Sequence, residues 1–215
     1  DSLDLANGAA VTSWKDVSGN GHEFTQGTVS SQPDFVATDS DYNNKPHVHF
    51  DGDDALATTF SSGLNPNNFT AFIVSTVDAD DGNYHGIVEN RDGNTGWILY
   101  ARMSGSANYW QWRTGTGSAV TTMSAGSNTV VPNTPSIVTL RMSGSDGAGG
   151  GTTTQNLFVN GVSEVTSSAV FTKKTATTAM PILGDVGSFE LTGQMAEVII
   201  YSSALSDQQR LQVEG

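Results

Sequence analysis

The sequence predicts an all-β fold, an antiparallel jelly-roll β-sandwich with one short C-terminal helix. Of its 215 residues, 24 are glycine, and with abundant Ser, Thr and Asn they separate many short β-prone segments. Helical periodicity is nearly absent, which disfavours a helical or mixed fold. A long apolar strand comes last, and such a strand must pair with strands formed much earlier, as happens in Greek-key and jelly-roll sandwiches.

The closing strand is predicted over residues 194–201, with apolar residues on both faces. A strand packed on both sides belongs in the middle of a sheet. Alternation turns Glu197 inward, where we expect its carboxylate to accept hydrogen bonds near residues 14–18. Ser206 is the expected N-cap of the terminal helix, because Gln209 three residues later completes a capping box.

The other strands follow from β-prone runs between turn residues. FTAFIVSTV at 69–77 is apolar enough for a core strand, and Asn160-Gly161 is the clearest hairpin signal, between strands at 157–159 and 162–165. The glycine-rich run 143–154 is predicted to be a flexible loop. Further strands are expected at 11–17, 22–26, 47–50, 55–60, 86–90, 96–103, 108–113, 118–123, 135–142, 170–173 and 180–184.

Composition indicates one domain, residues 1–215, with 36% hydrophobic residues to form a core. The formal net charge of -13 repels phosphate backbones and anionic membranes, so nucleic acid is not an expected partner. No run approaches ~18 apolar residues, so membrane insertion is not expected either. The absence of cysteine excludes disulfides and thiolate zinc sites. The start at Asp1, without a signal peptide, leads us to expect neighbouring domains in a larger exported protein.

Four segments occur in an order and spacing found in a known family. The first is VTSWKDVSGNGHEFTQ, with Trp14 and Asp16, and the second is KPHVHFDGDDALAT. The third is LFVNGV and the fourth ILGDVGSFELTGQMAEVIIYSSALSDQQR. On these motifs the chain resembles the laminin-G-like, concanavalin-A-like jelly-roll domains of bacterial secreted or surface proteins. The resemblance implies carbohydrate or adhesive ligand binding outside the cell or at its surface, often by an accessory module with structural calcium.

Catalysis is not expected, although glucanases and polysaccharide lyases share this architecture. Retaining glycosidases of this fold carry two glutamates in an E-x-D-x-x-E pattern. Here Glu190 and Glu197 have the wrong spacing, and Glu89 and Glu164 stand alone. The Gln-x-His of the lyases does not occur. A divergent glycoside hydrolase or polysaccharide lyase is therefore the least favoured function, behind a binding module and a structural spacer.

Acidic turns are the candidates for calcium. One turn after a core strand concentrates oxygen ligands, and we name Asp78, Asp80, Asp81 and Asn83 as the candidate set. The opposing interpretation is a solvated hairpin tip. The turn 50–54, FDGDD, is a second and weaker candidate. His47, His49 and Asp51 alternate along one strand and could hold zinc with a further ligand, but solvated or hydrogen-bonded histidines are the preferred interpretation.

The candidate ligand site is a run of aromatic and basic residues on neighbouring strands. Alternation places Trp97, Leu99, Trp110 and Trp112 toward the core. The opposite, solvated face is then expected to carry Arg91, Tyr100, Arg102, Tyr109, Gln111 and Arg113. Flat aromatic rings and planar polar groups are what sugar binding requires, and the arginines favour an anionic or sulfated glycan. Ordinary cross-strand pairing is the structural alternative.

The sequence therefore predicts a non-catalytic, lectin-like module that binds a glycan or polysaccharide. The alternative is a structural or adhesive spacer that binds a protein or no ligand. A spacer would cover Tyr100, Arg102, Tyr109 and Arg113 or pair them with acidic residues, whereas a binding module would leave them open.

Overall fold

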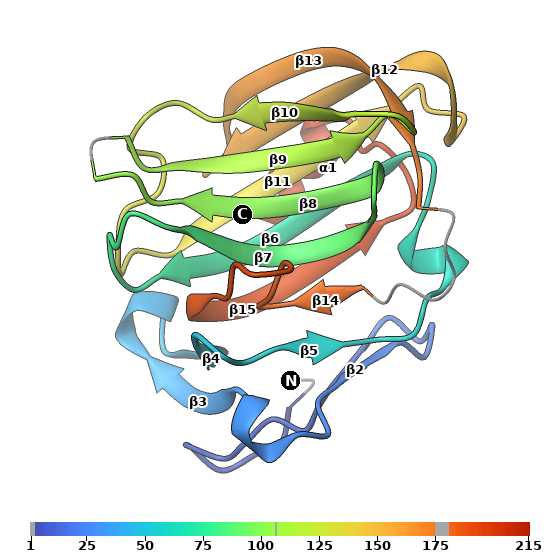
Figure 1. The fold of residues 1–215 in the computed structure, drawn as a ribbon. Coiled ribbons are helices and arrows are strands. Elements are labelled where there is room, and N and C mark those ends of the chain that lie inside the picture. Colours follow the sequence, from blue (N-terminus) through green and yellow to red (C-terminus); the bar gives the residue numbers. More distant parts are fainter. Residues whose placement is uncertain (1–2, 106, 175–180) are drawn as a thin grey trace.

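Two antiparallel sheets pack face to face in the computed structural model, which describes residues 3–105, 107–174 and 181–215 (Figure 1). The front sheet contains, in spatial order, β1 (Ser13–Lys15), β2 (Glu23–Thr25), β5 (Leu56–Ala57), β14 (Ile182–Leu183), β7 (Tyr84–Asp92), β8 (Thr95–Arg102), β9 (Tyr109–Gly115) and β10 (Val120–Ser124). The back sheet contains β13 (Val162–Thr172), β12 (Ala148–Val159), β11 (Ser136–Ser143), β6 (Phe69–Val77), β15 (Thr192–Tyr201), β4 (Lys45–Asp51) and β3 (Asp34–Asp39).

The short helices lie at the ends and on the outside of this sandwich. They are η1 (Val29–Ser31), η2 (Ser40–Tyr42), η3 (Ser62–Leu64) and the C-terminal α1 (Asp207–Glu214). The predicted jelly-roll sandwich with one short C-terminal helix is confirmed. None of the helices among the described residues is both long enough and apolar enough to span a membrane.

The closing strand β15 lies inside the back sheet, between β6 and β4, as predicted. Its expected alternation fails at Ala196. Met195 pairs with Ser75 and Glu197 pairs with the adjacent Val74, so Ala196 is the extra residue of a β-bulge. Beyond the bulge, each side chain of β15 points to the face opposite to the one that strict alternation predicts. Glu197 is therefore exposed, and the prediction that it faces inward was wrong.

The core between the sheets is built largely from aromatic rings. Phe69 on β6 stacks on Trp97 at 5.4 Å between ring centres and meets Trp112 edge-on at 6.0 Å. Trp97 and Leu99 on β8 and Trp110 and Trp112 on β9 are all buried in this core, which confirms the face assigned to them. The side chains that alternate with these along β8 and β9 therefore point to the outer face of the front sheet.

The β12–β13 hairpin confirms one prediction and overturns another. Asn160 and Gly161 have φ of 49° and 80°, as a type I′ turn requires, and Val159 pairs with Val162. The predicted flexible loop at 143–154 is instead largely strand, because β12 begins at Ala148 and pairs with β13. The separately predicted strand at 170–173 is mostly the end of β13, which runs to Thr172.

A few further elements differ from prediction. β3 was not predicted, because only Phe35 of its six residues is buried and the pattern resembles a polar loop. The strands expected at 11–17 and 55–60 shrink to β1 and β5. In the strand expected at 180–184, residue 180 lies outside the described residues and β14 covers Ile182–Leu183. The capping box of Ser206 and Gln209 at α1 is present as predicted.

Candidate functional site

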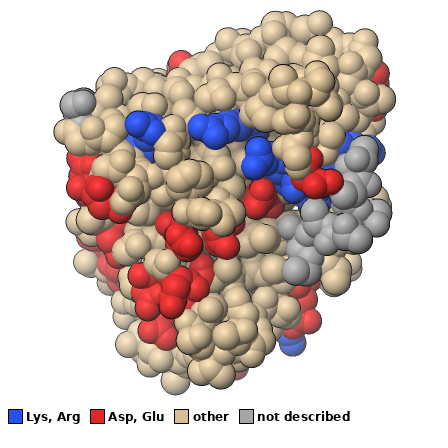
Figure 2. All heavy atoms as spheres, in the orientation of Figure 1, with Lys and Arg blue, Asp and Glu red and all other residues tan. Residues whose placement is uncertain are grey.

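The six predicted ligand residues share the outer face of the front sheet, on strands β7, β8 and β9. Their register forms two cross-strand rows: Tyr84, Arg102 and Tyr109 in one, and Gly86, Tyr100 and Gln111 in the other. Arg113 lies opposite Ile98 in the next row. We call this surface the arginine–tyrosine face; it comprises Tyr84, Arg91, Tyr100, Arg102, Tyr109, Gln111 and Arg113. In Figure 2 basic side chains cross the upper half of this view, and acidic ones gather below.

Four of the predicted residues, Arg91, Arg102, Tyr109 and Arg113, are partly exposed on this face. The other two, Tyr100 and Gln111, are only 3% and 4% exposed, so the prediction that they lie on a solvated surface was wrong. Tyr100 is buried because the segment between β14 and β15 lies across it, bringing Val186 and Phe189 onto the sheet. Neither Tyr100 nor Gln111 can offer a flat surface to a ligand.

Gly86 allows that covering segment to lie so close. A Cβ at this position would come within 2.5 Å of the Phe189 carbonyl oxygen and 2.6 Å of the Val186 backbone nitrogen. The Gly86 amide instead donates a 2.9 Å hydrogen bond to that carbonyl. Phe189 itself remains 38% exposed and packs against Tyr84 and Tyr100. Sequence reasoning missed Tyr84 and Phe189, because only the fold brings their rings beside the arginines.

Two arginines stack on the rings of this face. The Arg102 guanidinium carbon lies 4.4 Å from the centre of the Tyr84 ring, and that of Arg113 lies 5.1 Å from the Tyr100 ring. Arg113 Nε donates to Gln111 Oε1 at 2.8 Å, and Gln111 Nε2 donates to Ser124 Oγ at 3.1 Å. Gln111 thus orients Arg113 from below. Both guanidinium groups are held by rings, which leaves their edges available for hydrogen bonds.

Neither stacked arginine is neutralised by an acid. Within the described chain, no carboxylate lies within 4.0 Å of Arg102 or Arg113, and the terminal guanidinium nitrogens make no hydrogen bond there. Arg91 differs, because its Nε is 3.7 Å from Glu89 Oε1. In a protein with a net charge of -13, two unpaired guanidinium groups side by side form a local positive site.

Carboxyl groups adjoin this positive site. Burial raises the pKa of Glu89, against the attraction of Arg91, and the charge of Asp185 raises it further. Burial and the charge of Glu190 raise the pKa of Asp185, whose Oδ1 is buried without a hydrogen-bond partner. The sequence had indicated that Glu89 stands alone, but the structure places Arg91 and Asp185 near it. Carboxyl groups with raised pKa values can act as general acids. If the domain were an enzyme, Glu89 and Asp185 would be the candidate catalytic residues.

The candidate calcium ligands after β6 do not converge within the described structure. Asp78 accepts hydrogen bonds from Gln194 Nε2 at 2.5 Å and lies 3.1 Å from His49 Nε2. Asp80 accepts hydrogen bonds from the Gly105 amide and the Asn108 side chain. Asp81 contacts Asn83 and His85. Each carboxylate thus has its own protein partners, and calcium at this turn stays a prediction.

The second acidic turn brings three carboxylates together. Ligand atoms of Asp51, Asp53 and Asp54 all lie within 4.8 Å of one another, the one such group of three acidic or histidine ligands among the described residues. Asp54 is 5% exposed and accepts a 2.9 Å hydrogen bond from the Asp51 amide. Burial, together with the charge of Asp51, raises the pKa of Asp54 to about 6. Three carboxylates supply part of the oxygen shell that calcium requires.

Solved structures of toxin binding domains have the same fold. The binding domain of Paraclostridial Mosquitocidal Protein 1 aligns with a TM-score of 0.70 at 16% identity, over 97% of this chain and 50% of that one. The botulinum neurotoxin serotype G binding domain gives 0.69 at 13% identity, over 93% and 47%. A structure of botulinum neurotoxin type C, whose cell entry depends on two ganglioside molecules, gives 0.59 at 9% identity, over 95% and 50%. The chain spans about half the length of these proteins, and at such identities the likeness shows the fold alone.

Sequence comparison identifies the family. No sequence among the curated proteins matches this chain. A family model described as the concanavalin A-like lectin/glucanases superfamily matches residues 50–209, which include the third motif above, most of the second and all but the last residue of the fourth. The chain therefore belongs to the concanavalin A-like lectin/glucanases superfamily, as its motifs and its jelly-roll fold both indicate.

Proposed function

We propose that this domain is a non-catalytic, lectin-like module of an exported or surface protein, and that it binds an acidic glycan on the arginine–tyrosine face. One observation carries the proposal: Arg102 and Arg113 stack on tyrosine rings, and among the described residues their terminal nitrogens have no hydrogen-bond or carboxylate partner. A guanidinium edge binds a carboxylate or sulfate with two parallel hydrogen bonds. The half-exposed rings of Tyr84 and Phe189 would supply the apolar contact for the sugar's C–H face.

The family and the fold support this proposal. The superfamily contains lectins, and one neighbour in fold, botulinum neurotoxin type C, depends on gangliosides, which are acidic glycolipids. The observation that favours the spacer alternative is the burial of Tyr100 and Gln111. Arg102, Tyr109 and Arg113 remain partly exposed, as a binding module requires.

Glycan-array binding of the whole domain tests the proposal. We expect retention on carboxylated or sulfated glycans and little on their neutral counterparts, with loss of the signal in the Arg102→Ala/Arg113→Ala double variant. Lys15→Ala is the matched control, because it removes an exposed positive charge on β1, at the far edge of the same sheet. Equal binding of neutral glycans, or full binding by the double variant, would move the site elsewhere. Binding to no glycan would favour the spacer.

A further inference from the structure

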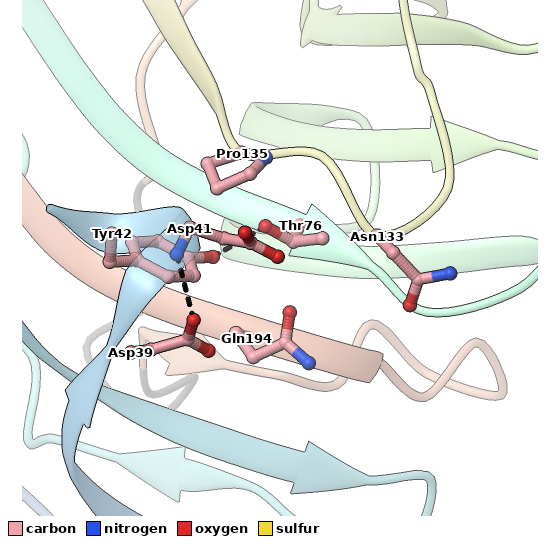
Figure 3. Close-up of a pocket in the computed structure, with 7 residues that line it drawn as sticks. All are labelled: Asp39, Asp41, Tyr42, Thr76, Asn133, Pro135 and Gln194. Atoms are coloured by element: carbon pink, nitrogen blue, oxygen red, sulfur yellow. Dashed lines mark hydrogen bonds between the residues drawn. The ribbon is translucent and has the colours of Figure 1, made fainter. Parts of the chain in front are cut away.

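A small polar hollow lies on the outer face of the back sheet, opposite the arginine–tyrosine face. Its volume is about 160 Å³ (Figure 3). Thr76 and Gln194 form its floor, because they are directly paired on β6 and β15. Its other lining residues are Asp39, Asp41 and Tyr42 around η2, and Asn133 and Pro135 from the loop before β11. The hollow thus joins four parts of the chain that are distant in sequence.

Acceptor oxygens around this hollow lack partners within the described chain. Asp39 uses Oδ1 to accept the Asp41 amide at 2.9 Å, and its Oδ2 accepts no hydrogen bond. The Asp41 carboxylate accepts no hydrogen bond from any residue that the structure describes. Gln194 donates its Nε2 to Asp78, which leaves its Oε1 free. Figure 3 shows Asp39, Asp41, Gln194 and Asn133 around one open space.

The buried His47 beneath the hollow does not balance the negative charge of Asp39. The His47 side chain is 3% exposed, and its Nδ1 lies 3.9 Å from Asp39 Oδ2 without any hydrogen-bond partner. Burial lowers the pKa of His47, so the ring is neutral at pH 7 and does not compensate the carboxylate. Among the described residues that line the hollow there is no lysine or arginine. Burial and the charges of Asp39, Asp78 and Asp41 raise the pKa of Tyr42 to about 12, which agrees with a negative field here.

We propose that this hollow binds a primary ammonium group at the end of a linear alkyl chain, as in a lysine side chain or a small polyamine. An ammonium group has three N–H donors, and Asp39 Oδ2, the Asp41 carboxylate and Gln194 Oε1 are three acceptors with the required negative charge. The volume equals that of roughly five waters in the liquid, enough for the ammonium and a few methylene groups.

A divalent metal ion fits this hollow less well. Calcium takes about six to eight oxygen ligands, with carboxylates prominent among them. The hollow offers two carboxylates, and the hydroxyls of Tyr42 and Thr76 are hydrogen bonded to each other at 2.5 Å. An ammonium group needs fewer ligands, and its three N–H donors match the three acceptors named above.

Titration of the whole domain with n-propylammonium chloride, followed by amide NMR at constant ionic strength, tests the proposal. We expect saturable shifts of Asp41, Asn133 and Gln194, and binding about tenfold weaker in Asp41→Asn, since a charge-assisted hydrogen bond is lost. Asp41 is exposed and its carboxylate makes no hydrogen bond or ion pair with the described residues, so this variant should fold. Asp92→Asn, an equal charge change at an exposed residue of the front sheet, should bind normally.

Five comparison compounds make the result decisive. Tetramethylammonium has the same charge but no N–H donor, so equal shifts with it would reduce the effect to general electrostatics and overturn the proposal. Calcium chloride that displaces propylammonium would assign the hollow to a metal. D-glucosamine carries its ammonium on a ring, and tighter binding by it would overturn the linear chain. Tighter binding by an Nα-blocked lysine than by 1,4-diaminobutane would identify a side chain, and the reverse a polyamine.

Discussion

The guanidinium of Arg102 lies 4.4 Å from the centre of the Tyr84 ring, on the outer face of the front sheet. The two residues are cross-strand neighbours in β7 and β8. The ring holds the guanidinium group in place and leaves its charge intact, whereas a carboxylate would neutralise that charge. The positive charge and its hydrogen-bond donors therefore stay available, and the following predictions begin from this geometry.

Replacing the Tyr84 ring should weaken binding of an acidic glycan even though both arginines remain. Tyr84→Leu removes the ring beneath Arg102, and a cation–π contact of this kind contributes about 0.5–1 kcal/mol, so we expect affinity to fall about two- to fivefold. Tyr84→Phe keeps the ring and should bind like the original protein. Isothermal titration calorimetry measures both affinities. Equal losses in the two variants would instead attribute the effect to the Tyr84 hydroxyl.

Gly86→Ala should destabilise the domain and disturb the arginine–tyrosine face. The added Cβ would meet the Phe189 carbonyl at 2.5 Å, and backbone cannot yield as a flexible side chain does. We expect a loss of about 1–3 kcal/mol in the free energy of unfolding, measured by denaturant titration. Gly151→Ala is the control, because nothing lies within 4 Å of its added Cβ. Equal stability of the two variants would show that the covering segment is not tightly seated.

Asp54 should give stability a distinctive pH dependence. Its pKa is about 6 in the folded protein against 3.8 for an ordinary aspartate, so the folded state holds the proton more tightly than the unfolded state. Stability from this group is therefore present at low pH and is lost as pH rises from about 4 to about 6. Asp54→Asn keeps an acceptor for the Asp51 amide and does not titrate.

Thermal melting in a chelating buffer measures this effect. The melting temperature of Asp54→Asn, relative to that of the unsubstituted protein, should rise as pH increases from 4 to 7. A constant difference across that range would mean that Asp54 does not titrate in it.

Calcium should act through the turn that contains Asp51, Asp53 and Asp54 and not through the turn after β6. Convergence within 4.8 Å at the first turn favours it, whereas Asp80 is already hydrogen bonded to Gly105 and Asn108. We expect calcium to raise the melting temperature, with the increase lost in Asp53→Asn and kept in Asp80→Asn. The opposite pattern would restore the site predicted from Asp78, Asp80, Asp81 and Asn83. No increase in any variant would exclude a stabilising calcium site at either turn.

Elements that are determined by a few neighbouring residues were predictable from the sequence. The apolar run of β6 defines its bounds, Asn160-Gly161 defines the hairpin turn, and Ser206 with Gln209 defines the start of α1. Strict alternation also placed Trp110 and Trp112 in the core.

Features that depend on contacts between distant segments were not predictable in this way. The bulge at Ala196 exposes Glu197, and nothing in the strand's own pattern announces it. The burial of Tyr100 depends on Phe189, 89 residues later, and on the missing Cβ of Gly86. The hollow around Gln194 requires η2, which follows the unpredicted edge strand β3.

The most direct test of the acidic-glycan site is the response of the arginine side chains themselves. A titration of the isotopically labelled domain with a sulfated oligosaccharide, followed through the Nε–H resonances, reports each guanidinium separately. We expect saturable shifts for Arg102 and Arg113, with Arg141 on β11 of the back sheet and Arg210 in α1 unchanged. Shifts confined to Arg141 and Arg210, or none at saturating ligand, would contradict a binding site on the arginine–tyrosine face.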